Sequence, residues 1–133
     1  MSVHAGLRAH LLSLAAVTEL VGERIHPSVL PDKAVLPALV YQVIGDVRDY
    51  THDQPLQLGH PLVQLDAWAL RQADALAVAD ALVAALVGYR GAMGAIAYAA
   101  GWRLEGQRDL FEAETGFYRV SLDFRGWFDA AAA

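Results

Sequence analysis

The segment from residue 118 to residue 128 alternates apolar and polar side chains almost without exception, and this period of two is that of a β-strand with one buried face. Its apolar face carries Tyr118, Val120, Leu122, Phe124 and Phe128. Its opposite face carries Arg119, Ser121, Asp123 and Arg125. Such a strand needs a hydrophobic layer on one side, and it presents charges of both signs on the other.

Hydrophobic periodicity also predicts two helices. Apolar residues recur at steps of three and four over residues 3–20 and again over residues 72–87. Gly22 and Gly88 follow these stretches and end the helices. Between the first helix and the next strand, three prolines predict an irregular connection.

Three further segments, rich in β-branched and aromatic residues, predict strands at 37–47, 62–70 and 95–111, the last bulged around Gly101. The order is therefore α-β-β-α-β-β. We predict an α+β fold of two layers, with a four-stranded, mostly antiparallel sheet and two helices on one of its faces. The other face is expected to carry Gln42, Gln64, Asp66, Trp68, Ser121, Asp123 and Trp127.

Length and composition limit the class of protein. A chain of 133 residues with 56% hydrophobic residues is predicted to form a single domain over residues 1–129, followed by a disordered alanine tail over 130–133. The net charge of −5 argues against general binding to nucleic acid, which requires clustered cations. There is no cysteine. No targeting or membrane-spanning segment is expected.

The sequence offers little catalytic apparatus. None of the five histidines lies in a zinc-binding motif, and no serine lies in a nucleophile elbow. The glycines of segment 88–94 follow a helix instead of preceding one, so they do not form a phosphate-binding loop. His52, Asp53 and His60 leave open a weaker option, a metal or acid–base cluster. We predict no enzyme, no cofactor and no metal.

Four segments together carry a resemblance to a known family: "GERIHPSVLP", "LPALVYQVIG", "LVQLDAWA" and "RDLFEAETGFYRVSLDFRGWF". They resemble, in the same order, the tail-completion proteins of long-tailed bacteriophages and gene-transfer agents, also called tail terminators or head–tail joining proteins. The resemblance implies a virion protein that forms a ring, generally a hexamer. The ring caps the finished tail tube and joins it to the head connector, and DNA passes through its channel.

This resemblance implies a place in the virion at the head–tail junction, and in the host cytoplasm during assembly. The candidate subunit-interface residues are Arg108, Arg119, Asp123, Arg125 and Trp127. The polar segment 48–61 is expected to be a long loop, and such loops are often functional. Its candidate contacts to the tail tube or connector are Arg48, Asp49, Tyr50, Thr51, His52 and Asp53.

Two alternatives stay open at the level of sequence. The charged sheet face is equally compatible with an ordinary solvated surface. The chain is also compatible with a small ligand-binding or regulatory α+β domain that acts as a dimer, which would require an apolar pocket with a few convergent polar groups. Interfaces are enriched in aromatic residues and arginine, and this favours the assembly function.

Overall fold

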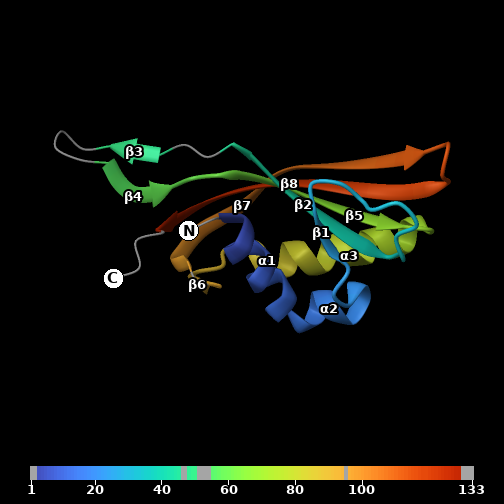
Figure 1. Cartoon of the computed structure of the whole chain (residues 1–133), viewed down its shortest axis with the longest axis horizontal. Coiled ribbons are helices and arrows are strands. Elements are labelled where there is room, and N and C mark those ends of the chain that lie inside the picture. The colour runs from blue at the N-terminus through green and yellow to red at the C-terminus, as the bar shows by residue number, and fades with distance from the viewer. Residues whose placement is uncertain (1–2, 46–47, 51–54, 95, 130–133) are drawn as a thin grey trace.

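The computed structural model describes residues 3–45, 48–50, 55–94 and 96–129. Three helices lie on one side of a single mixed sheet (Figure 1). The helices are α1 (Val3–Ser13), α2 (Ala15–Val21) and α3 (Gln72–Leu86). The strands are β1 (Ile25–Pro27), β2 (Ala38–Gly45), β3 (Arg48–Tyr50), β4 (Pro55–Gly59), β5 (Leu62–Ala69), β6 (Gly91–Met93), β7 (Ile96–Glu112) and β8 (Phe117–Asp129).

Two long hairpins form most of the sheet. In the first, β2 pairs antiparallel with β5. β3, which follows β2 in the chain, pairs antiparallel with β4, which precedes β5. In the second, β7 pairs antiparallel with β8 along almost its whole length. The hairpins join where β5 and β4 pair with β8. Six of the eight strands thus follow the path β1-β2-β5-β8-β4-β3, while β7 lies on the other side of β8 and pairs with β6.

The predicted architecture of four strands and two helices is therefore wrong. The described sheet has eight strands, and it is mixed because β1 pairs parallel with β2. β1 lies in the segment that was predicted to be irregular. Pro27 is the last residue of this three-residue strand, so it does not prevent the strand from forming. β3 and β4 fall in the predicted loop, so that loop is largely an extension of the first hairpin.

The predicted first helix is broken into α1 and α2. Leu14 adopts an extended conformation, with φ −87° and ψ 104°. The hydroxyl of Ser13 donates to the main-chain oxygen of His10 at 2.5 Å, and this side-chain bond competes with the continuing helix. The apolar spacing continues across the break, because Val17 and Val21 of α2 are fully buried. Periodicity alone does not reveal such a break.

The core lies between the sheet and the helices, and the alternation in β8 is confirmed. Val120, Leu122 and Phe124 are each at most 1% exposed. They belong to one cluster with Leu82 and Leu86 of α3. The helices thus cover one face of the sheet. The opposite face, called the outer face below, carries the polar half of the alternation.

No described helix is long and apolar enough to cross a membrane.

Candidate subunit interface on the outer sheet face

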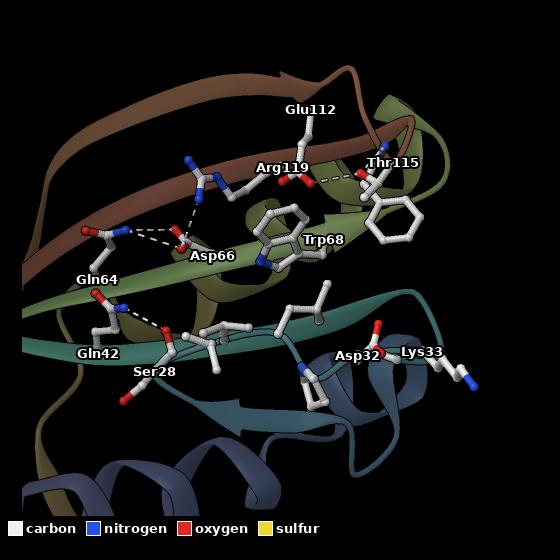
Figure 2. A pocket seen from close by; sticks show the side chains of 16 residues that line it. Ser28, Asp32, Lys33, Gln42, Gln64, Asp66, Trp68, Glu112, Thr115 and Arg119 are labelled. Atoms are coloured by element: carbon white, nitrogen blue, oxygen red, sulfur yellow. Dashed lines mark hydrogen bonds and ion pairs between the residues drawn. The ribbon is translucent and has the colours of Figure 1, made fainter.

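One end of the outer face is hollowed into a groove with a volume of about 560 Å³. Its floor consists of β2, β5 and β8 (Figure 2). Two connections border it: the 28–34 segment after β1, and the turn between β7 and β8. The groove is lined by Ser28, Val29, Leu30, Pro31, Asp32, Lys33, Ala34, Val40, Gln42, Gln64, Asp66, Trp68, Glu112, Thr115, Phe117 and Arg119.

A buried carboxylate organises the floor of the groove. Asp66 is only 5% exposed, and its two oxygens accept hydrogen bonds from Nε2 of Gln64 at 3.1 and 3.2 Å. Nη1 of Arg119 lies 3.9 Å from Oδ2 of Asp66 (Figure 2). A buried carboxylate requires this kind of compensation, because burial without a partner is costly. Gln64, Asp66 and Arg119 therefore form one polar cluster across β5 and β8.

Trp68 stands beside this cluster and forms the aromatic wall of the groove. The guanidinium carbon of Arg119 lies 5.1 Å from the centre of the Trp68 ring, within cation–π range. Phe117 packs edge-on against the same ring, with centroids 6.4 Å apart. Trp68 is 8% exposed, and no described residue accepts a hydrogen bond from its buried Nε1. The groove thus contains an unused hydrogen-bond donor.

The centre of the outer face holds a second charged cluster. Nη1 of Arg108, from β7, lies 2.8 Å from Oδ2 of Asp123 in β8. Nη2 of the same guanidinium donates to the hydroxyl of Ser121 at 3.0 Å. The hydrogen bond and the charge of Asp123 raise the pKa of Arg108, so this cation keeps its proton at every accessible pH. These contacts link the side chains of β7 to those of β8 across the outer face.

The far end of the outer face carries Trp127 and Arg125. The Trp127 ring stacks on the His60 ring, with centroids 4.3 Å apart and planes 17° apart, and it remains 41% exposed. Nε of Arg125 donates to Glu105 at 2.7 Å, and its Nη1 donates to the main-chain oxygen of His60 at 3.2 Å. The guanidinium thereby links β7, β8 and the junction between β4 and β5.

The five predicted interface residues share the outer face, but they form no single cluster. Arg119 belongs to the groove, Arg108 and Asp123 to the centre, and Arg125 and Trp127 to the far end. Each of the four charged residues has an ion-pair partner within its own chain. The charges predicted to meet a neighbour therefore already pair internally, while their side chains stay partly exposed.

The predicted contact loop lies only partly within the described residues. Arg48, Asp49 and Tyr50 form β3, whereas Thr51, His52 and Asp53 lie outside the described residues. The suggested cluster of His52, Asp53 and His60 therefore falls mostly outside them as well. Within the described ranges, no group of three or more His, Asp or Glu side chains is placed to hold a metal.

Sequence reasoning missed the groove. It placed Gln42, Gln64, Asp66 and Trp68 on the outer face correctly, because strand alternation decides the face. It did not place the 28–34 segment over that face. The only signal was the proline-punctuated connection itself, in which Ser28 and Lys33 adopt positive φ angles of 66° and 59°.

The match to a protein-family model decides which family this fold belongs to. The model described as "Tail completion protein gp17" matches residues 5–129. The chain belongs to the tail completion protein gp17 family. The resemblance noted in the sequence is therefore confirmed, and the chain is a structural tail protein of bacteriophage type.

A solved structure shares the fold of this tail completion protein. A chain in the virion of a native gene transfer agent particle superposes with a TM-score of 0.59 and is 19% identical. The alignment covers 96% of the present chain and 98% of the other. Among curated proteins, none matches the chain. The family match makes this protein a tail protein of bacteriophage type, and the shared fold agrees with that assignment.

Proposed function

We propose that this tail completion protein caps the finished tail tube as a ring, with six subunits, and joins the tube to the head connector at the head–tail junction. The match of the family model to residues 5–129 carries the proposal. DNA passes through the channel of the ring without sequence-specific binding, in keeping with the net charge of −5. Before assembly the protein is in the host cytoplasm. Its role is structural, and we assign it no catalytic step and no cofactor.

A ring of identical subunits requires heterologous contacts, in which one patch meets a different patch on the next copy. The outer face supports this role, since Arg108, Arg119, Asp123, Arg125 and Trp127 lie along it from the groove to the far end. Exposed ion pairs are individually worth about 0–1 kcal/mol, so these charges set register and specificity more than affinity.

The segment from Arg48 to Asp53 is proposed to contact the tail tube or the connector. β3 and β4 extend beyond the helices at one end of the sheet (Figure 1). We expect replacement of residues 50–53 by glycine and serine to leave the protein folded and to reduce head–tail joining. If this variant joined heads to tails as well as the wild type does, the proposed contact of this segment would be wrong.

The proposed function is tested by electron microscopy of particles made without this gene. We expect full heads separated from tails, and tails of uneven length, because nothing ends the tube or joins it. Normal joined particles would exclude the role as a terminator. Re-expression of the wild-type chain controls for effects on neighbouring genes.

The groove favours one alternative, a small ligand-binding dimer. Its volume of about 560 Å³ lies within the range of ligand pockets, and it combines apolar walls with polar groups. A screen for thermal stabilisation by small carboxylates and amides tests this function. The virion role predicts no stabilisation, whereas a shift in the midpoint that Trp68→Phe abolishes would support the alternative.

A further inference from the structure

Exposed apolar side chains gather at the two ends of the outer face. At the groove end, Val29 is 70% exposed and Leu110 38%. Val29 lines the groove, while Leu110 lines a smaller hollow that shares Trp68 with it. At the far end, Trp127 is 41% exposed. Exposed apolar side chains that lie beside a groove are candidates for protein association.

The groove also lacks a hydrogen-bond acceptor for Trp68. Its Nε1 is buried and makes no hydrogen bond with any described residue, although the ring is packed between Arg119 and Phe117. A buried N–H group without an acceptor destabilises a protein, and such groups are normally satisfied. An occupant that brings an oxygen atom, such as a main-chain carbonyl, into the groove would satisfy it.

Strand β8 places the two ends on the same face of the molecule. Arg119 and Trp127 are eight residues apart, and residues an even number apart on a strand point to the same face. At about 3.3 Å per residue they are separated by roughly 26 Å. The groove and Trp127 are therefore too far apart to contact each other within one chain. Because they are two different surfaces on the same face, they could form a heterologous contact between successive copies.

We propose that the groove binds the far end of a second copy of this chain, with the neighbour's Trp127 ring as the anchor. This inference rests on the proposed ring, because it identifies the two halves of the heterologous contact that a ring needs. Large aromatic side chains that enter a pocket commonly dominate the energy of an interface. The neighbour also supplies the oxygen that the indole of Trp68 lacks.

The described charges are compatible with this pairing. The groove is lined by the carboxylates of Asp32, Asp66 and Glu112, against the two cations of Lys33 and Arg119. At the far end, Arg103 and Arg125 stand against Glu105. The side chain of Arg103 is 64% exposed and lies 4.0 Å from Glu105, so it can turn from this long ion pair toward a carboxylate of the neighbour. Among these side chains the groove thus has one more negative charge than positive, and the far end one more positive than negative. This difference favours the encounter.

Two substitutions each remove one half of the contact. Trp127→Ala removes the anchor but leaves the groove, and Val29→Asp places a charge at the groove rim but leaves the anchor. Both positions are exposed, so both variants are expected to fold, and circular dichroism and thermal unfolding verify this. Val87→Asp is the matched control, because Val87 is 47% exposed at the end of α3 and lines neither hollow.

Sedimentation velocity of the full chain over a range of concentrations provides the measurement. We expect the wild-type chain and Val87→Asp to associate beyond a dimer, and each of the two test variants to associate at least about tenfold more weakly. A mixture of Trp127→Ala and Val29→Asp is expected to form a heterodimer and nothing larger, because it restores a single groove–anchor contact. A contact between identical patches would not be restored in this way.

The other outcomes would overturn the inference. They are wild-type association that neither substitution changes, a mixture that stays monomeric, and a wild-type chain that stays monomeric at every concentration. The first outcome would be compatible with the proposed ring, but it would show that the groove is not part of the contact between its subunits. Normal joined particles in the gene deletion would instead remove the proposed function, while the sedimentation result would still decide whether the groove binds a second copy.

Discussion

Arg125 donates to Glu105 across the β7–β8 hairpin, from Nε to Oε1 at 2.7 Å. Glu105 is the residue that the pairing register skips, since Leu104 pairs with Phe124 and Gly106 with Asp123. The ion pair therefore links the β-bulge of β7 to the neighbouring strand β8. Because Arg125 also donates to the main chain at His60, one side chain stabilises two irregular points of the sheet at once.

The first prediction concerns this ion pair. Arg125→Glu places like charges together and removes the hydrogen bond to the His60 oxygen, so we expect a loss of about 1–3 kcal/mol in the free energy of unfolding. The double swap Glu105→Arg with Arg125→Glu should recover part of that loss, because only the second contact stays broken. Urea denaturation of the wild type, of Arg125→Glu, of Glu105→Arg and of the double variant measures the coupling free energy between the two side chains. No recovery in the double variant would show that the pair contributes nothing.

The same charges allow a test of their role between subunits. If Arg119 and Arg125 guide the neighbour, reversing either charge weakens association in sedimentation more than Arg90→Glu does, because Arg90 lies in the exposed turn after α3. Association that is unchanged by Arg119→Glu and by Arg125→Glu would confine both residues to their internal ion pairs. Thermal unfolding of each variant separates loss of fold from loss of contact.

A second prediction concerns Gly126, which faces the indole of Trp102. A Cβ atom at Gly126 would lie 2.5 Å from Cδ2 of Trp102, and Trp102 is buried. Gly126→Ala is therefore expected to destabilise the protein by about 1–3 kcal/mol through overpacking. Gly45→Ala is the control, because a Cβ there meets no atom of the described residues within 4 Å, and it should change stability by less than about 0.5 kcal/mol. Equal effects would contradict the packing argument.

The sequence predicts faces better than it predicts strand ends. The alternation in β8 assigned side chains to the two faces of the sheet correctly, because a one-residue slip would reverse the whole strand. It did not predict that Ser121 on the polar face is buried. It could not show that β1 pairs parallel with β2, since that pairing depends on where the preceding chain runs. The helix break at Leu14 was also hidden, because Ser13 and Leu14 interrupt the hydrogen bonds but not the apolar spacing.

The candidate site shows the same limit. Polar outer-face residues such as Asp66 were identified because they share a strand period with their neighbours. The groove depends instead on the 28–34 segment and on the β7–β8 turn, which are far apart in the sequence and meet only in the folded chain. The internal partner of each charged residue could not be predicted either, since register and bulges decide which side chains face each other.

A third prediction tests the polar cluster in the groove. Asp66→Ala leaves Arg119 and Gln64 without the acceptor that they now share, so we expect a loss of about 1–3 kcal/mol in the free energy of unfolding. Asp66→Asn keeps an acceptor oxygen and should lose less. Asp109→Asn, at an exposed position of β7, is the control and is expected to change stability by less than about 0.5 kcal/mol. If Asp66→Ala behaved like that control, the cluster would have no structural role.

The fourth prediction is a pH dependence caused by His10. This ring is 7% exposed and lies 4.3 Å from the Tyr89 ring, and burial lowers its pKa below the ordinary value of 6.5. The unfolded chain therefore binds the proton more readily, so stability is fully present above about pH 6.5 and falls as the pH drops toward the folded-state pKa. Burial and nearby arginines lower the pKa of His26 as well, so both histidines contribute. His10→Phe keeps an aromatic ring against Tyr89 and should flatten the decrease in unfolding free energy between about pH 7 and pH 5. His26→Asn should flatten it further. A profile for His10→Phe parallel to that of the wild type would assign the dependence to other groups.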